Sequence, residues 1–128
     1  MTIPGWMGST NQRYRLGILY DKSGKPHAHE YIKEEYKAWQ DGAIMMIRTT
    51  ANAQRLVFAR RKDFAVSIMF CLPRDRMHKI EVDGAAKPTL DAIAEGLDLN
   101  DAWCRPLHLD KKAASDYGVE IMVEQESG

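Results

Sequence analysis

The chain has 128 residues with 18 basic and 18 acidic side chains, so its formal net charge is zero. Hydrophobic residues make up 45% of the chain and charged residues 28%, a composition that fits one globular domain with a single modest core. No apolar run approaches the roughly 20 residues of a membrane-spanning helix, and the first ten residues lack the features of a signal peptide. Two isolated cysteines, Cys71 and Cys104, exclude a disulfide framework. We therefore expect a cytoplasmic protein without membrane contact.

The first half of the chain predicts a strand, a long helix and a second strand. Residues 14–20 form the first strand, which a turn over 21–26 closes. Residues 64–72 are apolar enough for a central strand, and Pro73 ends it. Between these strands, from residue 29 to residue 50, apolar residues recur at spacings of three and four, which predicts a helix. Its apolar stripe consists of Ile32, Tyr36, Trp39, Ala43, Met46 and Ile47.

A basic loop and a second helix follow. Residues 73–79 form the loop, and residues 80–83 are predicted as the end of a further strand. The second helix covers about residues 85–95, with Gly96 at its C-cap. Pro88 is tolerated only in a first helical turn, which fixes the start of this helix close to residue 83.

The end of the chain predicts two more strands. They cover residues 102–109 and 118–124, and a polar loop joins them. The order of elements is therefore β-α-β-α-β-β. This order indicates an α/β fold, a single small domain over residues 1–128 with a mixed β-sheet and two helices packed on it.

The zero net charge conceals a gradient along the chain. Residues 55–79 have a balance of +5, whereas residues 80–128 have a balance of −7. Such asymmetry suits an enzyme that acts on a polyanion through metal ions. Scattered charges on a solvated surface would give the same balance.

Residues 81–101 hold the residues best suited to chemistry. In an extended segment Glu81 and Asp83 point to the same side. The loop after the next helix could return Asp101 to them, and three carboxylates suit a hard ion such as Mg²⁺. Lys87, four residues after Asp83, could stabilise a phosphoryl oxyanion, and Asp91 could pair with this lysine.

The same residues also allow a purely structural interpretation. Asp83 is a good N-cap residue for the second helix. Lys87 and Asp91 could form an exposed ion pair of little energetic consequence. Both interpretations stay open at the level of spacing.

The motif Asp83-Gly-Ala-Ala-Lys87-Pro-Thr-Leu-Asp91-Ala-Ile, followed by Asn100-Asp101, resembles the RusA-type Holliday junction resolvases. The hallmark of that family is an acid-x-acid-Asn element, a lysine four residues later, Leu-Asp-Ala-Leu, and a later Asp-Asp pair. Residues 9–14 are similar to the family's N-terminal Asn-Asn-Arg-Tyr region, and the order of elements agrees. The resemblance therefore covers nearly the whole chain.

Three positions depart from the family pattern. Glu81 stands where an Asp is usual, Gly84 replaces the usual Asn, and Asn100 replaces the first acid of the Asp-Asp pair. The first departure lengthens one ligand arm by a methylene group. The second removes a polar group beside the metal.

The resemblance implies a Mg²⁺-dependent endodeoxyribonuclease of recombination and repair, which acts as a homodimer on four-way DNA junctions. Glu81, Asp83 and Asp101 take the positions of its metal ligands, and Lys87 that of its active-site lysine. Asp83, Asp101 and Lys87 are then the catalytic residues. Two alternatives remain: a RusA-like protein that binds branched DNA without cutting it, and a small protein-interaction module. We expect DNA contacts from four basic residues: Arg13, Arg74, Arg76 and Lys79.

Overall fold

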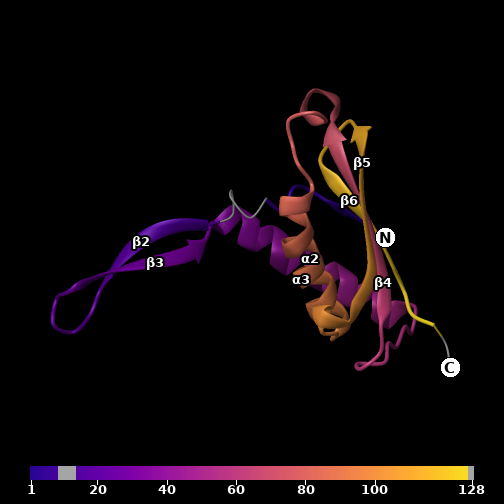
Figure 1. Cartoon of the computed structure of the whole chain (residues 1–128), viewed down its shortest axis with the longest axis horizontal. Helices are drawn as coiled ribbons and strands as arrows, with labels where there is room; N and C mark the ends of the chain where they lie inside the picture. The colour runs from indigo at the N-terminus through magenta and orange to yellow at the C-terminus, as the bar shows by residue number, and fades with distance from the viewer. Residues whose placement is uncertain (9–13, 127–128) are drawn as a thin grey trace.

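A computed structural model describes residues 1–8 and 14–126, and their side chains except those of 14–19 and 27–31 (Figure 1). The predicted α/β class, with a mixed sheet and two helices, is confirmed. The elements in chain order are β1 (Thr2–Pro4), β2 (Tyr14–Tyr20), β3 (Pro26–Ile32), α2 (Glu34–Ala53), β4 (Phe64–Pro73), the 3-10 turn η1 (Arg74–Arg76), α3 (Asp83–Leu97), the 3-10 turn η2 (Asp101–Trp103), β5 (Cys104–Ala114) and β6 (Gly118–Glu124).

Four strands form one mixed sheet in the order β1-β6-β4-β5. The strand β4 is antiparallel to β6 and parallel to β5. Parallel neighbours need a crossover connection, and here α3 supplies it between β4 and β5. The short strand β1, which the sequence pattern did not predict, pairs antiparallel with β6 at one edge. Three residues are too few to show a period of two.

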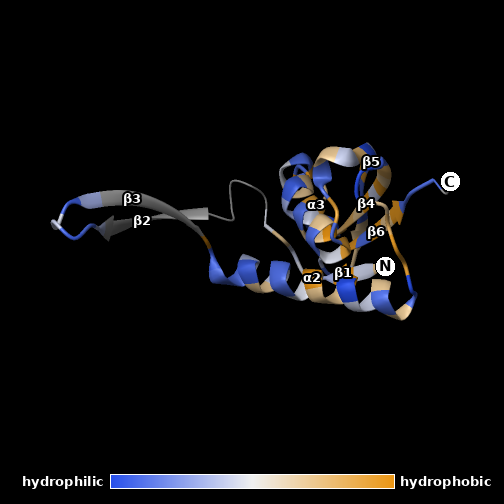
Figure 2. Cartoon of the chain, turned by 90° about the horizontal axis from the view of Figure 1, so that it is seen from below, coloured by the Kyte–Doolittle hydropathy of each residue, from blue (hydrophilic) through white to orange (hydrophobic). Residues whose placement is uncertain are grey.

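The helices α2 and α3 cover one face of this sheet (Figures 1 and 2). Alternate residues of β4 are buried beneath them, and the buried residues of α2 lie between its middle and its C-terminal end, from Ala43 to Ala51. Burial of such side chains is the main stabilising contribution to the fold. The core of the domain includes Ile3, Ala43, Ile44, Ile47, Phe64, Val66, Ile68, Phe70, Ala92, Ile93 and Val119.

The two helices approach closely at Gly96. A Cβ atom at this position would lie only 2.7 Å from Cγ2 of Ile47 on α2. The predicted role of Gly96 as C-cap is wrong, because α3 continues to Leu97. Gly96 lies inside the helix, where the close approach of α2 leaves no room for a side chain. The C-cap is Asp98, whose backbone is left-handed with φ 56° and ψ 48°.

The strands β2 and β3 form a separate antiparallel hairpin beyond the N-terminal end of α2, away from the larger sheet (Figure 1). The prediction of a helix from residue 29 is wrong, because α2 begins at Glu34. The backbone of β2 needs hydrogen-bonding partners, and the segment after the turn supplies them in register from Tyr14↔Ile32 to Tyr20↔Pro26. Asp21 fixes the turn, because its Oδ1 accepts the backbone N–H groups of Ser23 and Lys25, each at 2.9 Å.

The two final strands were predicted with different success. β6 has the predicted bounds, 118–124. β5 runs from Cys104 to Ala114, so the connecting loop is shorter than predicted, because residues 110–112 remain paired with β4. Within the described ranges, neither helix combines the length and the apolar character that crossing a membrane requires.

Candidate functional site

A lysine on β5 holds the loop that connects β4 to α3. The Nζ atom of Lys111 donates to the backbone carbonyls of Met77 and of Ile80, the latter at 3.2 Å. The same loop is closed by the backbone N–H groups of Lys79 and Ile80, which donate to the carbonyl of Arg76 at 3.0 and 3.2 Å. An ammonium group has three donors and can hold two carbonyls at once. The path of the chain into α3 is thus fixed relative to the sheet.

The basic side chains of this loop point to solvent. Arg74, Arg76 and Lys79 are exposed, and none of them forms an ion pair within the described part of the chain. Free exposed cations suit contacts to phosphate. The fourth predicted DNA contact, Arg13, lies outside the described residues.

The helix α3 begins at Asp83, close to where the sequence predicts, but the segment before it differs from the prediction. The extended segment over 80–83 is wrong, because Val82 has the helical angles φ −83° and ψ −17° and Asp83 is the first helical residue. Sheet pairing ends at Pro73, and the carbonyls of the following loop bind Lys111 instead of a strand. The N-cap interpretation of Asp83 is also wrong, since Val82 occupies that position without a side-chain bond.

Glu81 and Asp83 are both exposed at this helix start. The Oδ1 atom of Asp83 accepts the N–H of its neighbour Gly84 at 3.0 Å. The predicted position of Pro88 is wrong as well, because it lies buried in the second turn of α3. Its ring removes the helical hydrogen bond to the carbonyl of Gly84, so burial in the core outweighs a local cost.

Residues 83, 87, 91 and 95 repeat at four-residue intervals and therefore follow one face of α3. Lys87 and Asp91 form the predicted ion pair, with Nζ 3.4 Å from Oδ1. Their side chains are 72% and 40% exposed. Solvent screens such a pair, so it contributes little to stability. It orients the ammonium group of Lys87 along the helix surface.

Asp101 lies at the other end of α3. A cleft of about 540 Å³ is lined by Gln40 of α2 and by Asp91, Ala94, Glu95, Leu99, Asn100 and Asp101. We call it the acidic cleft. Only three residues separate α3 from η2, so the chain turns back beside the C-terminal half of the helix. The structure therefore brings Asp101 to Asp91 and not to Asp83, which lies roughly 12 Å from Asp91 along the axis at 1.5 Å rise per residue.

Asn100, one of the departures from the family pattern, has a structural contact. Its Oδ1 accepts the backbone N–H of Ala102 at 2.9 Å and so caps η2. An aspartate could accept the same bond. The cap thus fixes the position of Asp101 without requiring an acid at residue 100.

Across the described ranges, no three His, Cys, Asp or Glu side chains form a group that could hold a metal ion. The predicted cage of Glu81, Asp83 and Asp101 is therefore not assembled. The donors still match Mg²⁺ in kind, because this ion commonly takes one or two carboxylates, several waters and the phosphate oxygens of a substrate.

The two thiols are unsuited to nucleophilic chemistry. Burial raises the pKa of Cys104, and the nearby Asp101 carboxylate raises it further. Burial also raises the pKa of Cys71, with a further contribution from Glu120. Thiolate is the reactive form, so both groups are less reactive than a free cysteine.

Sequence reasoning did not identify the role of Lys111 or the place of Asp91 in the cleft. The first depends on the pairing of β5 with β4, which no local pattern shows. The second depends on the short turn from α3 to η2, and the spacing of Lys87 and Asp91 indicates only their ion pair. No family model matches this sequence, and no curated protein matches it.

Proposed function

We propose that this chain is a RusA-type, Mg²⁺-dependent endodeoxyribonuclease that resolves four-way DNA junctions in the cytoplasm as a homodimer. One observation carries the proposal. A loop of free cations, Arg74, Arg76 and Lys79, is held by Lys111 and leads directly into a helix that begins with exposed acids. The loop provides charge for the DNA backbone. The helix provides carboxylates and a lysine for the reacting phosphate.

The roles of the residues follow from the resemblance and from this geometry. By the resemblance, Glu81 and Asp83 would supply carboxylates for Mg²⁺, with water and phosphate oxygens of the substrate as further ligands. Asp101 lies at the other end of α3 and would have to come from a second protomer. The ion would polarise the phosphate and lower the pKa of a bound water. Lys87 places positive charge where the phosphoryl oxygens gain negative charge in the transition state. Asp91 orients Lys87 through the 3.4 Å ion pair.

A second candidate is a protein that binds branched DNA without cutting it. The separation of Asp101 from Asp83 favours this candidate, because no three acids of the described chain meet at one point. DNA phosphates and a second protomer would have to complete the ligand set in the nuclease. The basic loop serves both candidates equally.

The deciding experiment incubates the protein with a labelled four-way junction, with and without Mg²⁺. The nuclease should produce two symmetric nicks only with the metal, and a linear duplex of the same sequence should stay intact. Binding of the junction without nicks at any Mg²⁺ concentration would support the second candidate. Weak binding of both the junction and the linear duplex, independent of salt concentration, would favour the remaining alternative, a small protein-interaction module.

A further inference from the structure

A second, smaller pocket adjoins the acidic cleft. It has a volume of about 310 Å³ and is lined by Arg60, Arg61, Asp98, Leu99, Asn100 and Trp103. We call it the arginine–tryptophan pocket. Leu99 and Asn100 line both spaces, so the pocket and the cleft lie on the two sides of the turn that carries Asp101.

The two arginines of this pocket have different environments. Arg60 forms an ion pair with the carboxylate of Asp98, the left-handed C-cap of α3. Arg61 is exposed and forms no ion pair in the part of the chain that the structure describes. The ion pair thus holds the guanidinium of Arg60 at the C-terminal end of α3, whereas the guanidinium of Arg61 is available for an anion.

The tryptophan differs from the other two in the chain. Trp6 packs against Phe70 and Tyr117, at ring-centroid distances of 6.2 and 5.7 Å. Trp39 donates its indole N–H to the carbonyl of Pro4 at 3.1 Å. Trp103 is 38% exposed at the end of η2. An indole that stays accessible beside a free arginine is a surface on which a planar group can stack.

We propose that this pocket binds one unpaired nucleotide of the DNA substrate, with its base on the indole of Trp103 and its phosphate on Arg61. This inference rests on the proposed function, because only a DNA substrate would present a nucleotide, displaced from its pair at the branch point, beside Asp101. Stacking on an aromatic side chain together with a cationic contact is how proteins hold single-stranded nucleic acid. The pocket volume is at the lower end for small-molecule sites, which is room for about one nucleotide.

The position of the pocket beside the acidic cleft relates nucleotide binding to Asp101. Asn100 separates it from the acidic cleft, so a nucleotide held on Trp103 places an adjacent phosphodiester near Asp101. Bases at a branch point lose less stacking when they are displaced than bases inside a duplex. The pocket would therefore favour branched over linear DNA.

The test measures binding without cleavage, in EDTA, by the intrinsic fluorescence of the protein. The probes are a short oligothymidylate and a duplex of equal length. Oligothymidylate should quench the emission of the wild-type protein, and Trp103→Phe should abolish this change although Trp6 and Trp39 remain. Trp103→Ala should weaken oligothymidylate binding about ten-fold or more. Arg61→Ala should make the log–log salt dependence shallower by about one unit.

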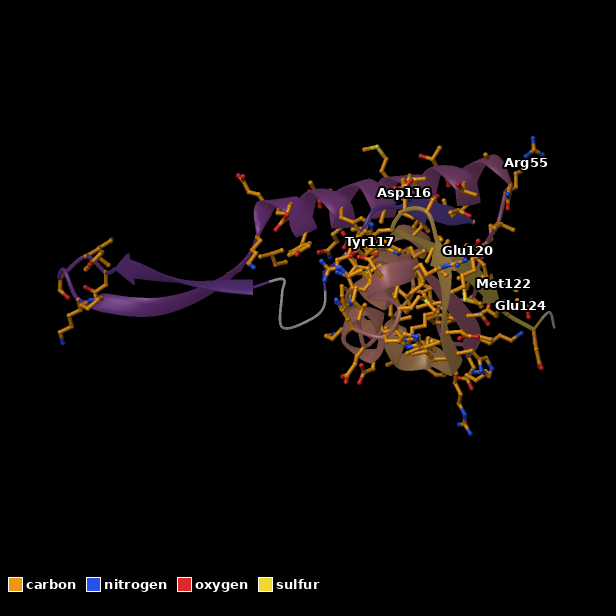
Figure 3. The ribbon with its side chains drawn as sticks, turned by 90° about the horizontal axis from the view of Figure 1, so that it is seen from above. Arg55, Asp116, Tyr117, Glu120, Met122 and Glu124 are labelled. Atoms are coloured by element: carbon orange, nitrogen blue, oxygen red, sulfur yellow. The ribbon has the colours of Figure 1, made fainter. Side chains whose placement is uncertain are left out.

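Arg55→Ala is the matched control. It removes the same charge from an exposed arginine at the C-terminal end of α2, outside the pocket (Figure 3). Its affinity should equal that of the wild type, and circular dichroism checks the folding of every variant. If Trp103→Ala is unfolded, Trp103→Phe and Arg61→Ala still decide the question.

Two outcomes would overturn the inference. One is an unchanged affinity of Trp103→Ala, and the other is persistent quenching in Trp103→Phe. If the junction is not cut in Mg²⁺ but oligothymidylate quenches Trp103, the nuclease proposal fails and the pocket stands. If the junction is cut and the Trp103 and Arg61 variants behave as wild type, the pocket alone is refuted.

Discussion

The Nζ atom of Lys111 lies 3.2 Å from the backbone carbonyl oxygen of Ile80, although 31 residues separate the two in the chain. This contact joins the edge strand β5 to the loop before α3. The contact fixes the loop relative to the sheet, and this loop leads directly to Glu81 and Asp83. Loops that carry function usually need such a fixed attachment to a rigid element.

We predict that Lys111→Met loosens the loop while keeping most of the side chain's volume. Two carbonyls lose a charged donor, so the free energy of unfolding should fall by about 1–3 kcal/mol. Junction cleavage should fall more than junction binding, since Glu81 and Asp83 lose their fixed approach. Lys112→Met is the control, because the ammonium group of Lys112 pairs with Glu120 on β6 instead of with the loop carbonyls. Equal effects of both variants on cleavage would contradict the prediction.

Asp83→Asn should abolish cleavage and leave the fold intact. The side chain is exposed, and an asparagine can still accept the N–H of Gly84. Only the charge that would bind Mg²⁺ is removed. Asp116→Asn provides the same change at an exposed position on the loop between β5 and β6 (Figure 3). Wild-type cleavage by Asp83→Asn would refute the role of this carboxylate in metal binding.

The basic loop should control affinity and not chemistry. In the double variant Arg74→Ala, Arg76→Ala, up to two phosphate contacts disappear. The log–log salt dependence of junction binding should then become shallower by roughly 1–2 units. Single-turnover cleavage at saturation should stay within a small factor of wild type. An unchanged slope would place the DNA elsewhere on the surface.

Gly96→Ala tests the packing of the two helices independently of function. The added Cβ would lie 2.7 Å from Cγ2 of Ile47, so α2 and α3 must separate slightly. We expect a loss of about 1–3 kcal/mol in unfolding free energy, as for other overpacked cores. Gly42→Ala on α2 is the control, since a Cβ there meets nothing within 4 Å. It should be neutral or slightly stabilising. The double variant Gly96→Ala, Ile47→Ala should lose less stability than the sum of its two single variants, because the shorter side chain leaves room for the added methyl group.

Local patterns predicted those parts of the fold that local forces determine. The bounds of β2 and β6 follow from strand patterns with turn residues at their ends, and both agree with the structure. The strand β3 could not be read in the same way, because it forms as the hairpin partner of β2. The helical spacing of apolar residues in α2 extends back to Ile32 and so predicts a helix from residue 29. Backbone pairing with β2 places residues 26–32 in a strand instead.

In the candidate site, too, local patterns predict some features, and others depend on contacts between distant segments. The ion pair between Lys87 and Asp91 follows from helical spacing alone, and the structure contains it. The separation of Asp83 from Asp101 depends on where α3 begins and on how short the turn to η2 is. Neither can be read from the spacing of the acids. The contact between Lys111 and the loop depends on the alignment of two strands, which is a property of the whole sheet.

The last prediction concerns Lys87, where the structural and the catalytic interpretation give different results. The chain offers a matched control in another exposed i,i+4 pair, Lys37 and Asp41 on α2, with Nζ 3.7 Å from Oδ2. If both pairs are only surface ion pairs, Lys87→Ala and Lys37→Ala should each cost a few tenths of a kcal/mol in stability. Neither should then change the cleavage rate.

If Lys87 faces the reacting phosphate, its loss removes one preorganised charge from the transition state. Single-turnover cleavage of a saturated junction should then fall by about two orders of magnitude or more. The melting temperature should hardly change, because the side chain is 72% exposed. Asp91→Asn should have a smaller effect in the same direction, since it releases Lys87 without removing its charge. Equal rates for Lys87→Ala and Lys37→Ala, with normal melting of both, would rule out a catalytic role for this lysine.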